Sequence, residues 1–150
     1  MSEQTFPFSC KIATSDPTCA LSLEILLDDE RIYYNPHVSD TVEFSHEIND
    51  TELKKDRELK FVMSGKKPEH TQILDSESGT IIKDVLLSVT EITMDDIDIG
   101  LIVDAKSVYS HNFNGTGRDT QESFFGEMGC NGTVSFAFST PIYLWLLENM

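Results

Sequence analysis

The chain has 150 residues, and its 26 acidic against 11 basic side chains give a formal net charge of −15 at pH 7. A surface with this charge repels phosphate groups, which argues against nucleic acid and anionic membranes as partners. The length suits one domain with its own core, and 39% apolar residues are typical of a folded, soluble protein. The N-terminus lacks the positive flank and apolar run of a signal peptide, which predicts synthesis in a cytoplasm without export.

The first expected elements are an irregular arm and a hairpin. We expect residues 1–20 to form the arm and residues 21–150 to form a single domain. In Leu21–Leu27 apolar residues occupy every second position, which predicts a half-buried strand. Asp28-Asp29-Glu30 is typical of a turn, and Arg31–Tyr34 continues as the return strand of a hairpin.

Further segments with the two-residue period of a strand follow along the chain. They are Thr41–Ile48, Leu59–Met63, Thr80–Ile82, Val85–Thr93, Asp95–Val103 and Val134–Phe138. The last apolar run, Ile142–Leu147, is interpreted as a buried strand, although so short a run also allows a helix. No sustained helical period and no nucleotide-binding glycine motif accompanies these segments, which argues against an α/β fold.

Together these segments predict an all-β fold, specifically an antiparallel β-sandwich that is jelly-roll-like. About seven to nine short strands separated by turns are typical of that architecture. The expected core consists of Leu23, Ile25, Leu27, Val42, Phe44, Ile48, Leu59, Phe61, Met63, Val134, Phe136, Phe138, Leu144 and Leu146.

The chain contains candidate metal ligands, but none of them forms a recognised metal-binding motif. Asp95, Asp96 and Asp98 supply the carboxylate oxygens that calcium prefers, but their spacing does not match an EF-hand loop, and solvated surface charge is the alternative. The cysteines lack a CxxC or Cys/His cluster, so we expect reduced thiols without metal, and the dispersed histidines could form a zinc site only by long-range convergence. These residues are Cys10, Cys19, Cys130, His37, His46, His70 and His111.

Aromatic residues near turns are the main candidates for ligand or partner binding. A ring face beside amides and carboxylates suits a sugar, and an exposed ring suits a protein partner. In each adjacent pair, Tyr33-Tyr34 and Phe124-Phe125, strand alternation exposes one ring and buries the other. The glycine-rich stretch from Asn112 to Gly132 is the longest expected loop and is predicted to form the main partner-binding surface. The candidate binding residues are Tyr33, Tyr34, Tyr109, His111, Asn114, Phe124 and Phe125.

Two C-terminal stretches, Met128–Thr133 and Pro141–Met150, are the parts of the chain whose resemblance to known proteins is most specific. Together with Leu21–Leu27, Leu59–Lys66, Glu69–Thr71, Asp84–Ile99 and the rest of Phe113–Met150, they resemble a group of small proteins encoded by marine cyanophages, in the same order. The strands of those proteins are similar to the β-sandwich of calcium-dependent carbohydrate-binding modules. The resemblance implies a virion protein that is made in the host cytoplasm and assembled on a particle, with other virion proteins and glycans as partners.

Three functional hypotheses follow from these observations. The first is a non-catalytic phage virion component, a capsid decoration or tail accessory protein that attaches to other proteins and is displayed on the surface. The alternative is a calcium-dependent carbohydrate-binding module, in which calcium would be the cofactor. The third is a small jelly-roll metalloenzyme, but the sequence contains no nucleophile elbow or other recognised catalytic motif, so we expect no enzyme activity.

Overall fold

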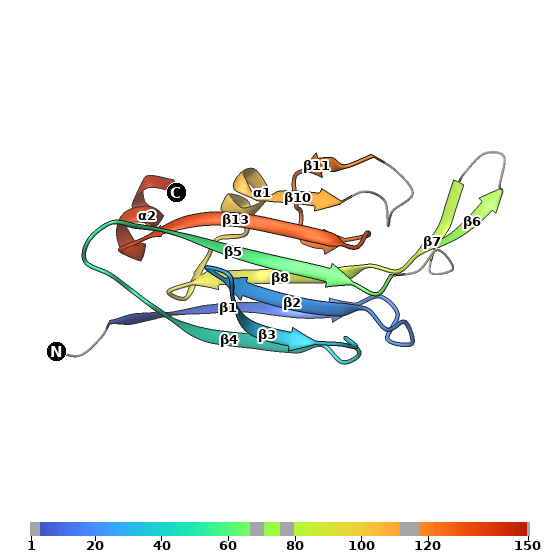
Figure 1. Cartoon of the computed structure of the whole chain (residues 1–150), viewed down its shortest axis with the longest axis horizontal. Coiled ribbons are helices and arrows are strands. Elements are labelled where there is room, and N and C mark those ends of the chain that lie inside the picture. The colour runs from blue at the N-terminus through green and yellow to red at the C-terminus, as the bar shows by residue number, and fades with distance from the viewer. Residues whose placement is uncertain (1–3, 67–70, 76–79, 112–117, 150) are drawn as a thin grey trace.

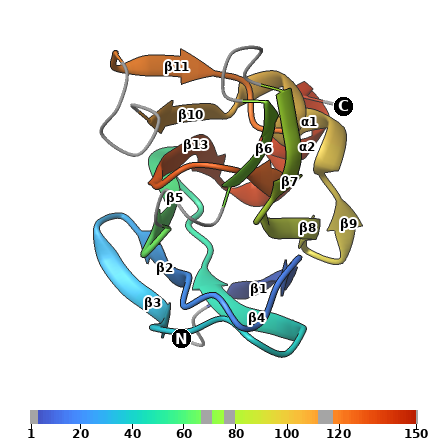
Figure 2. The ribbon, with the colours of Figure 1, turned by 90° about the vertical axis from the view of Figure 1, so that its right-hand side faces the viewer.

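Two facing antiparallel sheets form the body of the protein in the computed structural model, which describes residues 4–66, 71–75, 80–111 and 118–149 (Figure 1, Figure 2). The first sheet has the strand order β12-β8-β1-β4, and β9 pairs with β8. Its strands are β1 (Thr5–Thr14), β4 (Val42–Asn49), β8 (Leu87–Met94), β9 (Ile97–Asp98) and β12 (Glu127–Met128). The second sheet has the order β11-β10-β13-β5-β2-β3. Its strands are β2 (Ser22–Leu27), β3 (Glu30–Asn35), β5 (Lys55–Ser64), β10 (Val108–His111), β11 (Thr120–Glu122) and β13 (Gly132–Thr140).

The path of the chain confirms the predicted antiparallel, jelly-roll-like sandwich. It leaves the first sheet after β1, forms β2 and β3 in the second, returns for β4 and crosses again for β5. A separate two-stranded ribbon, β6 (Thr71–Asp75) and β7 (Thr80–Asp84), projects from one end of the body (Figure 1). In the part of the chain that the structure covers, no helix has the length and apolar character to cross a membrane.

Aromatic rings on the inner faces join the two sheets. Phe6 of β1 meets Phe138 of β13 edge to face, with 6.4 Å between ring centroids. The ring of Phe44 in β4 lies 5.0 Å from that of Tyr33 in β3. These residues alternate with outward-facing neighbours because successive side chains of a strand point to opposite faces. The hydrophobic core therefore lies between the two sheets and holds them in a fixed relative position.

Most of the predicted core is buried, and the exceptions have physical causes. Val42 and Phe44 are only partly buried because β4 is an edge strand that pairs with β1 alone. Leu144 is exposed, so its assignment to the core was wrong. The remaining predicted core residues lie in the buried cluster.

The hairpin that joins β2 to β3 confirms the turn predicted at Asp28-Asp29. Both residues have positive φ, 50° and 68°, as a two-residue hairpin turn of the mirror-image type requires. Asp95 and Asp96, with φ of 54° and 62°, form an equivalent turn between β8 and β9. Aspartate tolerates this left-handed conformation better than most residues, so these carboxylates have a role in the turn itself.

The N-terminal segment is not the irregular arm that we expected over residues 1–20. Residues 5–14 form β1, which lies between β4 and β8 and pairs with both. Phe6, Phe8, Cys10 and Ile12 are buried at every second position, a pattern that was present in the sequence. Burial raises the pKa of the Cys10 thiol to about 12. This strand therefore supplies part of the core instead of flanking it.

The second half of the predicted strand Asp95–Val103 is a helix. Strand β9 ends at Asp98, and α1 (Gly100–Lys106) begins two residues later. The adjacent residues Ile102 and Val103 are both buried, which a strand could not achieve because neighbouring side chains would point to opposite faces.

The chain ends in helix α2 (Ile142–Asn149), and not in the buried strand that the apolar run predicted. Its buried residues Ile142, Trp145 and Leu146 have the three- and four-residue spacing of a helix face. A distant side chain caps the first turn, since Asp50 Oδ1 accepts a hydrogen bond of 3.0 Å from the backbone N–H of Ile142. The helical period explains why Leu144, expected in the core, faces outward.

Candidate functional site

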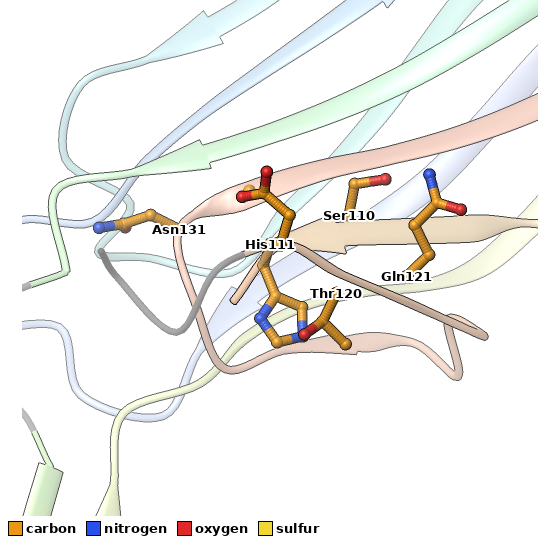
Figure 3. A pocket seen from close by; sticks show the side chains of 7 residues that line it. Ser110, His111, Thr120, Gln121 and Asn131 are labelled. Carbon is orange, nitrogen blue, oxygen red and sulfur yellow. The ribbon is translucent and has the colours of Figure 1, made fainter. Parts of the chain in front are cut away.

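A polar hollow of about 660 Å³ lies where β10, β11 and β13 run side by side at one edge of the second sheet. Figure 3 shows the side chains that line it. They are Ser110, His111, Asp119, Thr120, Gln121, Asn131 and Gly132. The hollow combines hydroxyl, amide, imidazole and carboxylate groups, so its lining is mainly polar.

The register of β10 and β11 sets the direction of these side chains. Ser110 is paired with Gln121, and His111 is paired with Thr120. Cross-strand partners share a face of the sheet, so the first pair points one way and the second pair points the other. Figure 3 shows this division, with Ser110 and Gln121 on one side of the strands and His111 and Thr120 on the other. The hollow is thus bounded by polar groups from both faces of the sheet edge.

His111 is held in place on the inner side of this edge. Its ring is buried, and its centroid lies 4.7 Å from that of Tyr109. Nε2 of His111 lies 3.3 Å from Oε1 of Glu122 on β11. The imidazole therefore links β10 to β11 and supplies a fixed wall of the hollow.

Another part of the lining is fixed by an exchange of hydrogen bonds between Asn131 and Lys66. The Asn131 side chain accepts a bond from the backbone N–H of Lys66 and donates one to its carbonyl, both 2.9 Å long. The ammonium group of Lys66 donates to the carbonyl of Gly129 at 2.5 Å. Tyr109 adds a further tie, because its hydroxyl accepts from the N–H of Cys130 at 2.8 Å and donates to the carbonyl of the same residue. The segment that leads into β13 is therefore rigidly placed.

Gly132 is required by the close approach of β13 to β10. A Cβ atom at this position would lie 2.9 Å from Cβ of His111 and still closer to the carbonyl oxygen of Ser110. Since the nearest atom belongs to the backbone, no rotation of a side chain could relieve the clash. The glycine keeps the two strands close and leaves the floor of the hollow free of side-chain bulk.

The chemistry of the hollow suits a ligand with many hydroxyl groups. Ser110, Thr120 and Gln121 can each donate and accept hydrogen bonds, and the exposed carboxylate of Asp119 is a strong acceptor. Of the described lining residues, none presents an exposed aromatic ring. Recognition here would therefore depend on hydrogen bonds more than on ring stacking.

The structure separates the aromatic residues that were predicted to bind. Tyr109 and Phe124 are buried in the core, which corrects the expectation that they face a ligand. Tyr33 is partly buried against the core, and Tyr34 is 48% exposed with the Arg31 guanidinium 4.6 Å from its ring centroid. One ring of each adjacent pair is exposed, as predicted, since Phe125 is 71% exposed beside the buried Phe124. Phe124 and Phe125 lie between β11 and β12, so the alternation of a strand explains the Tyr33-Tyr34 pair alone.

These exposed rings do not gather around the polar hollow. Tyr34 lies on β3, at the opposite edge of the same sheet, and Phe125 lies beside α1. Asn114 lies outside the described residues. Of the predicted binding residues, His111 lines the hollow. Sequence reasoning did not single out the other lining residues, although several fall within the stretch from Asn112 to Gly132 that was predicted to bind.

The predicted calcium ligands are spread along a turn and a short strand. Asp95 and Asp96 are exposed at the β8–β9 turn, and Oδ1 of Asp98 accepts a hydrogen bond of 2.8 Å from the N–H of Gly100. Among the residues whose placement is described, no three His, Cys, Asp or Glu side chains are grouped to hold a metal ion. Calcium binding therefore stays a prediction.

The histidines considered for a metal centre have separate surroundings. Nε2 of His37 lies 2.8 Å from the carbonyl oxygen of Pro17, and the His46 ring is stacked on Phe44. His70 lies outside the described residues. His111 has the neighbours given above, so the described histidines do not converge on one site.

The comparisons with known proteins give distant structural likenesses. No family model matches the chain, and no curated protein matches it at a significant level. The chain is similar to a solved structure described as "vCBM60 in complex with galactobiose", at 11% identity and a TM-score of 0.46, over 87% of this chain and 96% of the other. It is also similar to a selenomethionine form of vCBM60, from work on two families of calcium-dependent carbohydrate binding modules, at 11% identity and a TM-score of 0.48, over 87% of this chain and 89% of the other.

Proposed function

We propose that this domain is a non-catalytic carbohydrate-binding module, and that the polar hollow at the β10–β11–β13 edge holds its ligand. The observation that carries the proposal is the lining of the hollow by hydroxyl, amide and carboxylate groups of Ser110, Gln121 and Asp119. Sugars offer donors and acceptors in every direction, which such a lining can match. The support comes from this hollow, and not from the distant structures named above.

The size and the rigidity of the hollow favour the same function. Its volume of about 660 Å³ falls within the range of roughly 300–1,000 Å³ that is typical of small-ligand sites. Its walls are tied by the Asn131–Lys66 exchange and by the His111–Glu122 contact. Polar groups that are fixed before binding lose little conformational entropy when the ligand arrives.

The absence of catalysis is part of the proposal and has its own support. Most glycoside hydrolases place two carboxyl groups about 5–9.5 Å apart around the scissile bond. Of the described residues that line the hollow, Asp119 is the one that carries a carboxylate. Glu122 is directed to His111 instead. Incubation of bound glycans with the protein should therefore leave them uncleaved.

The proposal can be tested with a glycan array followed by calorimetric titration of the glycans that bind. Ser110→Ala and Gln121→Ala should each weaken binding about twofold to tenfold, the effect of losing one hydrogen bond of roughly 0.5–1.5 kcal/mol. Ser135→Ala is the matched control, because Ser135 lies on β13, which pairs with β10, but does not line the hollow. Binding by no glycan, or equal binding by all variants, would overturn the proposal.

The same titrations decide whether calcium takes part. Binding that disappears after chelation and returns with added calcium would support the calcium-dependent form of the function. Binding that survives chelation would restrict the function to a carbohydrate-binding module without a metal cofactor. In either case the virion role and the host-cytoplasm origin stay predictions, which mass spectrometry of purified particles would test.

A further inference from the structure

A second surface, which shares no lining residue with the polar hollow, surrounds helix α1. We call it the α1 surface and define it by Leu101, Phe125, Glu91, Asp98 and Asp104. Leu101 is 85% exposed and Phe125 is 71% exposed. Phe125 lines a hollow of about 130 Å³, and Leu101 lines a second hollow of about 610 Å³. The two hollows share Gly100 and Asp104 of α1. Leu101 on α1 and Phe125 beside α1 are therefore two large exposed apolar side chains at adjoining hollows.

The packing of α1 explains why these apolar groups remain outside. Ile102 and Val103 use the inner face of the helix to contact the core, and the helical period turns Leu101 away from them. Phe125 follows Phe124, whose ring is buried against Phe61 and Tyr109. In both places the exposed residue follows or precedes a residue that faces the core.

Helix α2 ends beside the α1 surface and has exposed apolar residues of its own. Asn149, at the end of α2, lines the larger hollow together with Leu101, and Figure 2 shows the two helices close together. Tyr143, Leu144 and Leu147 are exposed on the outer side of α2. Such an accumulation of exposed apolar side chains marks an interaction site more often than a free surface.

Charge determines which partner fits. The ionisable residues that line the two hollows, within the described chain, are Glu91, Asp98 and Asp104, and all three are acidic. Lys106 in the last turn of α1 is the nearby base on the same helix. A second copy of this chain would bring its own formal charge of −15 and the same acidic rim, so self-association is opposed by repulsion. A partner with basic side chains would be attracted.

We propose that the α1 surface docks a segment of a partner protein that carries large apolar and basic side chains together, such as a basic amphipathic helix. The apolar side chains of that segment contact Leu101 and Phe125, and its lysines or arginines lie against Glu91, Asp98 and Asp104. Apolar contact supplies the affinity, and the acidic rim supplies the attraction and the choice of partner. This surface shares no residue with the polar hollow, so it can act while a glycan is bound.

The test uses the full chain and a synthetic amphipathic helical peptide made of leucine and lysine, with binding followed by fluorescence anisotropy. Leu101→Ser and Phe125→Ala should each weaken binding about tenfold or more, as loss of an apolar anchor does. Asp104→Asn should weaken it less, and its effect should shrink as salt concentration rises. The matched control is Leu53→Ser, because Leu53 is 84% exposed but belongs to the segment between β4 and β5.

The outcomes separate the proposal from its competitors. Selective loss in the α1 surface variants, with Leu53→Ser equal to the parent protein, supports it. Equal weakening by Leu53→Ser, or equal binding of a peptide with glutamate in place of lysine, would overturn it. Analytical ultracentrifugation could give a third result, in which the parent protein is a dimer and the Leu101→Ser variant is a monomer. That result would assign the surface to a second copy of the chain and would also overturn the proposal. Thermal melting confirms that each variant is folded, and glycan titration reports separately on the polar hollow.

Discussion

Strand β13 and helix α2 are consecutive segments that expose different kinds of side chain to solvent. In β13, Val134, Phe136 and Phe138 point to the core, and the residues between them are serine and alanine. In α2, the core takes Ile142, Trp145 and Leu146, and the outer side carries Tyr143, Leu144 and Leu147. A period of two residues separates polar from apolar side chains in β13. In α2 the helical period places apolar residues on the outer side of the helix as well as on the side that faces the core.

This difference explains why the molecule has two kinds of candidate site. The polar outer residues of the second sheet continue into the hollow at the start of β13, where hydrogen-bonding groups collect. The outer side of α2 is apolar, and the exposed apolar residue Leu101 lies on the other helix, α1. A strand of the sandwich therefore favours a hydrophilic ligand, and a helix packed on its end favours an apolar partner.

The largest expected effect tests the helical period of α2. Trp145 packs edge to face on Phe136 and Phe138, at centroid distances of 5.7 and 6.2 Å. Trp145→Ala should therefore lower the free energy of unfolding by about 3–5 kcal/mol. Leu144→Ala, the adjacent control, should change it by less than about 0.5 kcal/mol. Denaturant titration measures both, and the reverse order of effects would mean that the segment is a strand with Leu144 inside.

The second prediction concerns the close contact at the start of β13. Gly132→Ala places a Cβ against the backbone of Ser110 and should cost about 1–3 kcal/mol of stability. It should also weaken binding at the polar hollow, because β10 and β13 must move apart. Gly100→Ala at the start of α1 is the control, since the nearest atom is the side-chain oxygen of Asp98 at 3.1 Å. Equal melting temperatures for the two variants would show that the tight approach at Gly132 is not needed.

The smallest effect tests the tie between β10 and the segment that precedes β13. Tyr109→Phe removes the hydroxyl that bonds both backbone groups of Cys130, so stability should fall by about 1–2 kcal/mol. Tyr143→Phe is the matched control, because Tyr143 is exposed on α2. Thermal melting compares the two variants. A Tyr109→Phe protein as stable as Tyr143→Phe would mean that the hydroxyl does not fix the wall of the hollow.

The strands could be predicted from the sequence because the order of polar and apolar residues in each strand reflects which of its faces is buried. The alternation in Leu21–Leu27 or Val134–Phe138 reflects one buried and one solvated face, and the paired aspartates mark a tight turn. The same pattern over Phe6–Ile12 was visible but was assigned to an arm. Within the candidate site, His111 was singled out from its aromatic neighbours. Ser110, Gln121 and Asn131 were not, since isolated polar residues carry no local signal of convergence.

What the sequence determined by itself was therefore the fold class, the hairpin at Asp28-Asp29 and the exposure of one ring in each aromatic pair. These depend on residues that are neighbours in the chain. The tertiary structure decided the helix at Ile142–Asn149, whose first N–H is capped by Asp50 just after the end of β4. It also decided the polar hollow, which joins residues of β10, β11 and the start of β13. Both depend on contacts between distant segments, and a local period contains no information about a partner that only folding brings near.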